Sequence, residues 1–397
     1  MIGSIYVALS GMLGHERGLN VIGNNVTNMN TLGFRGSSVD FADVFLGAAP
    51  NGVGAGMNDQ RGIGGGVDAS RTTVDFRAGL SQNTGNDLDA VLQGDGFFIV
   101  QDETGAIRYT RAGAFDIVDD ELVLRGQKVK VMTRDGGGQL LPISLKDLRT
   151  HAGKGTSEIT LGGNFKDGDD AFSIESVDVF DQTGKKHTLR LDFTEHDPNS
   201  TDNPLPFTVW SVSVKEQGEE IGTGDLRFLS LSPQESPLSL HLAFAGTDAI
   251  DVKLDYGSVQ IQNIGDDSDV KVSKQDGFAL GQITGKTFDE KGVLKLSYSN
   301  GQSADGPKLA LAQVIDQNAL VQVGNALFEY RGSQPATIRE AGDDLKVQPR
   351  FLEGSNVDLT NEFSQLILMQ RGYQASSQVI STANDMLQEL LDLRGRR

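Results

Sequence analysis

Two segments with a helical period stand at opposite ends of this chain, and they limit its possible folds more than any other feature. Near the N-terminus, apolar residues recur at alternating four- and three-residue steps, at Ile2, Tyr6, Leu9 and Leu13. The C-terminal segment repeats this spacing over a longer stretch, at Leu366, Met369, Tyr373, Ser376, Ile380, Ala383, Leu387 and Leu390. Such spacing is typical of a coiled-coil seam. We therefore expect two terminal helices that pack against each other and against copies of the same chain.

The chain between these ends has the pattern of a β protein. Short apolar runs alternate with turns, and 49 glycines stand against 10 prolines. With 38% apolar residues the chain can form packed cores, which separates it from a disordered tract. The sequence predicts a mainly β fold with terminal α-helices, in which nested, discontinuous β-domains accompany an N-/C-terminal helical coiled-coil region.

At 397 residues the chain is too long for one compact core, and its pattern changes along its length. We expect a terminal helical core from residues 1–30 with 358–397, and an extended, aperiodic connector from 31–70 with 345–357. The pattern of the first β block returns near Gly281, which predicts an inner β-domain from 71–142 with 284–344. Residues 143–283 would then form an outer β-domain inserted into the inner one.

Composition excludes several classes of site and partner. The chain has no cysteine, so disulfides, thiolate zinc sites and a thiol nucleophile are ruled out. Its net charge of −19 lies almost wholly between the two ends and disfavours nucleic-acid binding. No stretch approaches the roughly 18–20 continuous apolar residues of a membrane span. The N-terminus lacks the basic region of a cleaved signal peptide, so we expect any export to use another route.

The motifs of catalysis and metal binding are incomplete. The glycine run at 62–66 lacks the Lys-Ser/Thr ending and the flanking strand and helix of a phosphate loop. The five histidines form no HxH or HExxH pair. Two acidic turns, at 167–170 and 266–269, lack the full spacing of a calcium loop. We therefore expect no enzyme activity, no catalytic residue, no cofactor and no metal site. A secreted calcium-dependent adhesin and a β-rich hydrolase remain as alternatives from other classes.

Both ends of the chain carry motifs that resemble one protein family. The N-terminal string from Asn20 to Arg35, which includes Asn24, Asn25, Asn28, Gly33 and Phe34, resembles the signature of bacterial flagellar axial proteins, the rod, hook and hook-associated subunits. The C-terminal strings 354–359 and 370–375 resemble the matching tail of that family. Residues 92–98 and 109–115 are similar to the inner β-domain of rod and hook proteins. Hook subunits match better than rod subunits, which lack an outer block such as residues 143–283.

The resemblance implies a structural subunit that self-assembles into the flagellar hook, a curved, flexible tube that transmits torque from rod to filament and encloses the export channel. It implies a helical homo-polymer located outside the cell, in the hook and basal body of the bacterial flagellum, and serving motility. The implied partners are the distal rod protein, the hook cap, the hook–filament junction protein, the hook-length control protein and the flagellar type III export gate. A distal rod or other axial protein is the alternative within the family.

The expected assembly interface combines the helical faces with the N-terminal signature. It comprises Ile2, Tyr6, Leu9, Leu13, Asn24, Asn25, Asn28, Gly33, Phe34, Leu366, Met369, Tyr373, Ile380, Leu387 and Leu390. The pair Phe41 and Phe45 resembles the short element by which such substrates engage the export gate. The alternative for these two phenylalanines is simple packing of the connector. A pair of helices cannot bury both apolar faces alone, so we also expect the ends to be largely disordered in the monomer and to fold on assembly.

Overall fold

The computed structural model describes residues 2–45, 64–166, 168–196, 207–229, 232–244, 249–262, 267–342 and 344–395. The fold is mainly β, with one α-helix at each end of the chain, as the sequence predicts. The chain divides into two compact units. Unit 1 comprises residues 1–146, 286–295 and 305–397, and unit 2 comprises 147–285 and 296–304. The finer division into four segments stays a prediction.

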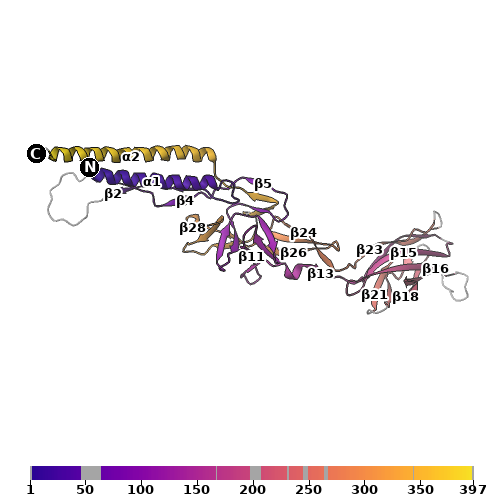
Figure 1. Ribbon diagram of the computed structural model, residues 1–397. Coiled ribbons are helices and arrows are strands. Elements are labelled where there is room, and N and C mark those ends of the chain that lie inside the picture. The colour runs from indigo at the N-terminus through magenta and orange to yellow at the C-terminus, as the bar shows by residue number, and fades with distance from the viewer. Residues whose placement is uncertain are drawn as a thin grey trace. The chain divides into compact units, whose positions relative to one another are not determined.

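The two helices belong to unit 1 and lie side by side (Figure 1). They are α1 at Ile2–Thr27 and α2 at Leu359–Gly395. Asp358 caps the start of α2, because its carboxylate accepts a 2.8 Å hydrogen bond from the Thr360 amide. Past the end of α1 the chain turns at Gly33, which has a φ of +65°.

The other strands of unit 1 form one large sheet and several small ones. The large sheet has the order β28-β29-β8-β7-β11-β10-β9, with β12 paired to β11, β27 to β7, and β30 to β27. Its strands are β7 Phe97–Gln101, β8 Ile107–Thr110, β9 Phe115–Val118, β10 Glu121–Leu124, β11 Lys130–Arg134, β12 Leu140–Pro142, β27 Leu311–Gln313, β28 Leu320–Gly324, β29 Leu327–Tyr330 and β30 Thr337–Arg339. Strands from both halves of the chain therefore share this sheet, since Leu311 pairs with Phe98.

Four two-stranded sheets carry the segments that precede and follow the large sheet. The pairs are β1 Ser37–Val39 with β4 Thr72–Val74, β2 Ala42–Phe45 with β3 Gly64–Asp68, β5 Ser81–Asn83 with β32 Phe351–Glu353, and β6 Ala90–Gln93 with β31 Lys346–Pro349. The described part of the segment expected to be an extended connector, 31–70, contains three short strands, and its assignment as a connector stays a prediction. Its short strands evade a periodicity search because each is only three to five residues long.

Unit 2 contains two five-stranded sheets whose inward side chains form one core. One sheet has the order β20-β21-β14-β22 with β23 paired to β14, and the other has the order β15-β16-β17-β18-β19. The strands are β14 Glu158–Lys166, β15 Ala171–Phe180, β16 Lys186–Glu195, β17 Phe207–Glu216, β18 Glu219–Leu229, β19 Ser232–Gln234, β20 Leu238–Leu242, β21 Ile250–Asp255, β22 Val259–Gln262 and β23 Lys271–Gln275. At the centre of the core, the rings of Phe165 and Trp210 stack with centroids 4.3 Å apart.

A further four-stranded sheet, in the order β13-β24-β25-β26, includes the chain positions at which the units change. Its strands are β13 Thr150–His151, β24 Gly281–Phe288, β25 Val293–Tyr298 and β26 Ser303–Lys308. Two short 3₁₀ turns complete the described elements, η1 at Lys146–Leu148 and η2 at Gln317–Ala319.

Candidate assembly interface

The helices α1 and α2 pack antiparallel along a line of small residues. A Cβ added to Gly18 would lie 2.8 Å from the Met369 sulfur, and one added to Gly11 would lie 3.0 Å from the Ser376 hydroxyl. Earlier positions in α1 thus meet later positions in α2, which fixes the antiparallel direction. The glycines lie seven residues apart, as do their partners, so each pair recurs on the same helical face. The missing side chains allow the two helices to approach closely.

The expected pairing of the two chain ends is therefore confirmed, but the apolar residues predicted on α1 do not face α2, and their place in contacts between subunits stays a prediction. Tyr6 and Leu13 are 67% and 54% exposed, and Leu9 is also exposed. Their large side chains would keep the helices apart, whereas the glycine face brings the backbones together. In α2 the predicted face fits better, since Met369 and Ser376 meet α1. The side chain of Ile2 lies outside the described residues.

A buried polar contact interrupts the seam where α1 ends and α2 begins. The Asn25 side-chain amide donates a 3.0 Å hydrogen bond to Glu362 Oε1 and a 2.7 Å bond to the Ser37 carbonyl. Its oxygen accepts a 3.0 Å bond from the Ser37 amide. Burial raises the pKa of the Glu362 carboxyl, and Asn25 lowers it in part. Asn25, predicted as an interface residue, thus joins α1, β1 and α2 within one chain.

The N-terminal and C-terminal motifs that resemble those of flagellar axial proteins contact each other just beyond the helices. The Gly33 amide donates a 2.9 Å hydrogen bond to the Glu353 carbonyl, and the Gly36 amide donates a 2.8 Å bond to Asn356. Gly33 fits here because of its left-handed backbone and because a Cβ would lie 2.5 Å from the Ala112 nitrogen. Phe34 is buried inside the subunit. These signature positions therefore have roles within the chain, and a role in contacts between subunits stays a prediction for them.

Two other predicted interface residues act at the end of α1. The Asn28 side-chain amide donates 3.0 Å hydrogen bonds to the Asn24 carbonyl and to the Asn24 side-chain oxygen. The Thr31 hydroxyl donates in turn to the Asn28 side chain at 3.1 Å. These bonds link the last turn of α1 to the turn that follows it. Asn24 itself is exposed.

Large apolar side chains remain uncovered on the helices after they have paired. On α2 the exposed ones are Phe363, Ile367, Leu368, Tyr373, Val379, Met386, Leu390 and Leu391. Leu366, Ile380 and Leu387, which were predicted to lie at the interface, are half-buried. Together with Tyr6, Val7, Leu9 and Leu13 on α1, the exposed α2 residues form what we call the outer helical face. A soluble monomer seldom exposes so many large apolar side chains on two helices, and such exposure is typical of a protein–protein contact.

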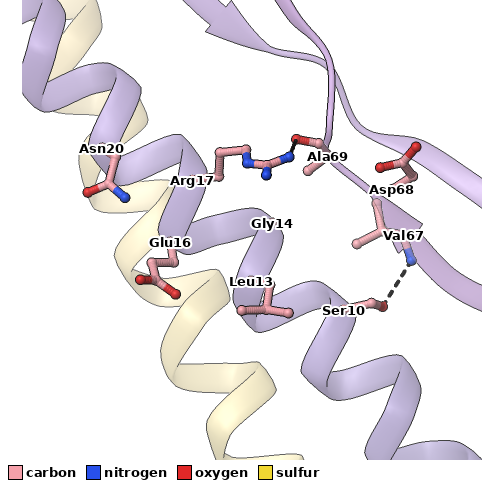
Figure 2. Close-up of a pocket in the computed structure, with 9 residues that line it drawn as sticks. All are labelled: Ser10, Leu13, Gly14, Glu16, Arg17, Asn20, Val67, Asp68 and Ala69. Atoms are coloured by element: carbon pink, nitrogen blue, oxygen red, sulfur yellow. Dashed lines mark hydrogen bonds between the residues drawn. The ribbon is translucent and has the colours of Figure 1, made fainter.

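Two pockets border α1 within unit 1. One, of about 1000 Å³, is lined mainly by small and apolar residues from three elements: Gly3, Ser4, Tyr6, Val7, Ala8 and Gly11 of α1, Gly64–Val67 of β3, and Ala375, Ser376 and Val379 of α2. The other, of about 420 Å³, is more polar and lies between α1 and β3 (Figure 2). There Arg17 donates a 3.0 Å hydrogen bond to the Ala69 carbonyl, and the Val67 amide donates a 3.1 Å bond to Ser10. These bonds attach the β2–β3 hairpin to the helix.

The two phenylalanines of the expected export element lie in the same hairpin region. Phe41, 40% exposed, places its ring centroid 5.5 Å from that of His15 on α1. Its ring also lies against Gly14, where a Cβ would be 3.0 Å away. Phe45 belongs to β2, and its backbone pairs with Gly64 in β3. Phe41 therefore packs the connector onto α1, and an export role stays a prediction.

The two acidic turns that were considered as calcium loops form hydrogen bonds with each other and with neighbouring residues. Asp169 accepts a 2.8 Å hydrogen bond from Ser268, and Asp269 accepts a 2.7 Å bond from the Asn164 amide. Asp167 and Asp266 lie outside the described residues. Among the residues that the structure describes, no group of three His, Cys, Asp or Glu side chains is arranged to hold a metal ion. Within the same residues, no helix has the length and apolar content to cross a membrane.

Sequence reasoning missed several residues through which α1 packs against α2 and against the β2–β3 hairpin. Gly11, Gly14, Gly18 and Glu362 were not predicted as contacts, although each packs against or bonds to a partner. A signal for them was present, because glycine disfavours a helix interior by about 1 kcal/mol and three occur here within eight residues. Repeated glycines in a helix indicate a close approach of another element.

Comparisons with known proteins match both ends and the middle of the chain. The family model for the flagella basal body rod protein matches residues 5–35, and the model for the flagellar basal body rod FlgEFG protein C-terminal region matches 348–393. Between them, the model for the flagellar hook protein FlgE/F/G D1 domain matches residues 91–166.

Full-length relatives have the same description. The chain is 28% identical to the flagellar hook protein FlgE of Borreliella burgdorferi, over 99% of this chain and 100% of that protein. It is 26% identical to FlgE of Salmonella typhimurium, over 98% and 99% of the two chains. A solved structure, the flagellar hook protein FlgE2 of Helicobacter pylori, aligns with a TM-score of 0.45 and 12% identity, over 68% of this chain and 100% of that one.

Proposed function

Because the chain belongs to the family of flagellar hook proteins, we propose that it is the structural subunit that polymerises into the flagellar hook. Relatives named as hook proteins extend over nearly its full length. Those matches favour a hook subunit over a rod subunit or an adhesin. The expected location is the hook, outside the cell.

The observation that carries the proposal is the outer helical face. Side chains such as Leu13, Ile367 and Leu368 are 54%, 52% and 65% exposed although their helices have already paired. Burying one such side chain stabilises an assembly by about 1.5–3 kcal/mol. Because α1 and α2 carry these residues along much of their length, several neighbouring subunits are needed to cover them. A head-to-tail contact that does not close on itself yields a helical tube.

The length difference between the helices supports the same arrangement. From the Gly11–Ser376 contact, the antiparallel register reaches the start of α1 near Asp385, and α2 continues to Gly395. Met386, Leu390 and Leu391 lie on this extension and are exposed. They are available to neighbouring copies rather than to α1 of the same chain. The resulting tube would form the wall of the export channel and transmit torque from rod to filament.

The heterologous partners follow from this role. A hook subunit would contact the distal rod protein at one end of the tube and the hook–filament junction protein at the other. During growth it would meet the hook cap, the hook-length control protein and the type III export gate. For the export gate, Phe41 and Phe45 remain the proposed recognition element.

Electron microscopy of purified full-length protein tests the proposal. We expect tubes from the native chain and none from a chain lacking residues 1–30 and 360–397. A more specific variant combines Leu13→Ser, Ile367→Ser and Leu368→Ser. It leaves unchanged the contacts of Gly11 and Gly18 with α2, which we call the glycine seam. This variant should raise the critical concentration for assembly by at least about tenfold, because apolar burial at each contact is lost.

The matched control is Leu280→Ser, because Leu280 is 53% exposed but lies in unit 2. It should assemble like the native chain. Tubes that form equally well from the triple variant and from the control would contradict the proposal.

A further inference from the structure

Three charged side chains are buried together in unit 1. Arg35 donates a 2.7 Å hydrogen bond to Glu353 Oε1, and Arg111 Nη1 lies 3.6 Å from Glu353 Oε2. The exposed fraction of the three side chains is 0% for Arg35, 4% for Arg111 and 1% for Glu353. Charged side chains are seldom buried so completely, because removal from water is costly unless partners compensate.

The three residues come from distant parts of the chain. Arg35 follows α1, Glu353 ends β32 shortly before α2, and Arg111 lies between β8 and β9 of the large sheet. Arg111 also donates to the carbonyls of Leu92 and Gly94, at 3.1 and 2.6 Å. The cluster therefore connects the segment leaving α1 and the segment entering α2 to the same part of the sheet.

The cluster holds two cations and one anion. Within the described residues, Arg35 Nε and Nη1 and Arg111 Nε have no hydrogen-bond partner. Burial lowers the pKa of the Arg111 guanidinium to about 10, while Glu353 raises it. Glu353 Oε1 also accepts a 2.8 Å bond from the Gly79 amide. Glu353 is thus the shared anion of both arginines and a bond acceptor for a fourth segment.

We propose that Arg35, Arg111 and Glu353 form an intrachain clamp. It fixes the C-terminal end of α1 and the N-terminal end of α2 to the β-strands of unit 1. The part of the N-terminal signature that ends in Gly33-Phe34-Arg35 then acts inside the subunit, while the outer helical face acts between subunits. Glu353 is the positioning residue on which the clamp depends, because it is the buried carboxylate that both arginines contact.

The number of buried charges that each substitution leaves unpaired distinguishes an electrostatic clamp from ordinary packing. Glu353→Gln changes the shape of the side chain very little but leaves two buried cations. Arg35→Met changes the shape more but leaves one cation and one anion. Removing one partner of a buried pair is strongly destabilising because the remaining charge is uncompensated. A packing role would instead make the larger change in shape the more harmful one, and would make the double substitution worse than either single one.

The test measures amide hydrogen exchange on the full-length soluble chain. The reporters are the Gly33 amide, which bonds to the Glu353 carbonyl, and the Gly79 amide, which bonds to its carboxylate. The Ile99 amide, bonded to the Ala310 carbonyl in the large sheet, reports on unit 1 as a whole. The variants are Glu353→Gln, Arg35→Met and their combination. Glu340→Gln is the control, because its pair with Lys308 leaves Glu340 66% exposed.

We expect Glu353→Gln to lower protection at Gly33 and Gly79 by more than about tenfold, and by more than at Ile99. Arg35→Met should lower it less, and adding Arg35→Met to Glu353→Gln should restore part of the loss. Glu340→Gln should change nothing. Unprotected reporters in the native chain, equal losses at all three amides, or a double variant worse than Glu353→Gln would each overturn the clamp. Failure to form tubes with these amides still protected would count against the proposed function and leave the clamp standing.

Discussion

At the scale of single residues, Asp181 shows how a buried carboxylate makes unit 2 sensitive to acid. Its Oδ1 accepts hydrogen bonds from the Thr183 hydroxyl, the Thr183 amide and the Lys185 amide, at 2.6, 2.8 and 2.9 Å. Burial raises the pKa of Asp181, but these bonds together outweigh burial and lower the pKa to about 2. The pKa of Asp276 is also lowered, where bonds from Lys154 and Ser157 outweigh the burial that raises it.

A carboxyl group with a lowered pKa in the folded state stabilises that state above its unfolded pKa of about 3.9. The contribution is lost as the pH falls through the folded value, so unit 2 should lose stability between about pH 4 and pH 2. Asp181→Asn should make this dependence shallower and cost about 1.5–3 kcal/mol at neutral pH. Fluorescence of Trp210, the single tryptophan, reports unfolding because that residue is fully buried in unit 2.

Asp251→Asn is the control for this prediction, because the Asp251 side chain is 84% exposed. It should leave the acid transition unchanged. The explanation fails if Asp181→Asn and Asp251→Asn have the same pH profile as the native chain.

Residue-scale prediction from the sequence succeeded where the cause was local. The turn at Gly33 was predictable, because asparagines crowd the helix end and glycine readily adopts the left-handed backbone that follows. The contact between Arg35 and Glu353 was not, because 318 residues separate them. No periodicity within one segment records a partner at that distance.

At the scale of elements, the glycine seam predicts a specific crosslink. A Cβ added to Gly11 would lie 3.9 Å from the Ser376 Cβ, within the range of about 3.5–4.5 Å found in disulfides. Because the chain has no cysteine, Gly11→Cys with Ser376→Cys creates a single possible bond within each chain. We expect most of the protein to form an intrachain disulfide under mild oxidation, seen as faster migration in a non-reducing gel.

The control pair combines Gly11→Cys with Ser377→Cys, since Ser377 is exposed and next to the seam position. It should crosslink about tenfold more slowly, because side chains one residue apart on a helix point in different directions. Equal crosslinking of both pairs, or bonds only between chains, would contradict the antiparallel seam. Slow crosslinking of the Ser376 pair before assembly and fast crosslinking after it would support ends that order on assembly.

Helical periodicity predicted the existence of both helices but not the face on which α1 pairs. The large apolar residues Tyr6, Leu9 and Leu13 are the obvious candidates for a seam, yet they are exposed. A hydrophobic pattern reports which face is buried in the assembled state and not which partner buries it. In α2, where Met369 and Ala383 lie on the predicted face, the pattern and the contact coincide.

At the scale of the whole molecule, unit 2 has a core of its own. Its main hydrophobic cluster contains only residues between Ile159 and Val270, including Phe165 and Trp210. Just outside this range, Lys154 and Phe278 exchange backbone hydrogen bonds of 2.9 and 3.0 Å. The chain therefore leaves toward this core and returns from it at adjacent positions. The return of one sequence pattern near Gly281 predicted such an insertion, whereas the pairing of individual strands depends on contacts that a single sequence does not reveal.

This geometry allows the core of unit 2 to be removed as one piece. Deleting residues 156–276 joins Gly155 to Gly277 and leaves Lys154 and Phe278 as the bonded pair beside a Gly-Gly turn, which suits a two-residue hairpin. No part of the main cluster remains exposed, so unit 1 should fold and still present the outer helical face. We expect the shortened chain to assemble into tubes, since the surfaces proposed to drive assembly are retained.

The shortened tubes should be straighter or stiffer than native ones. We propose that bending requires neighbouring subunits to exchange polar contacts between their copies of unit 2, because surface ion pairs, worth about 0–1 kcal/mol each, exchange easily. Arg190 with Glu175, and Lys186 with Asp178, are exposed pairs of this kind in unit 2. Without unit 2, the helices and the large sheet would carry all contacts between subunits, and apolar contacts lose more free energy when they slide. Persistence length and curvature measured on electron micrographs provide the comparison, and tubes that bend as much as native ones would place flexibility in unit 1 instead.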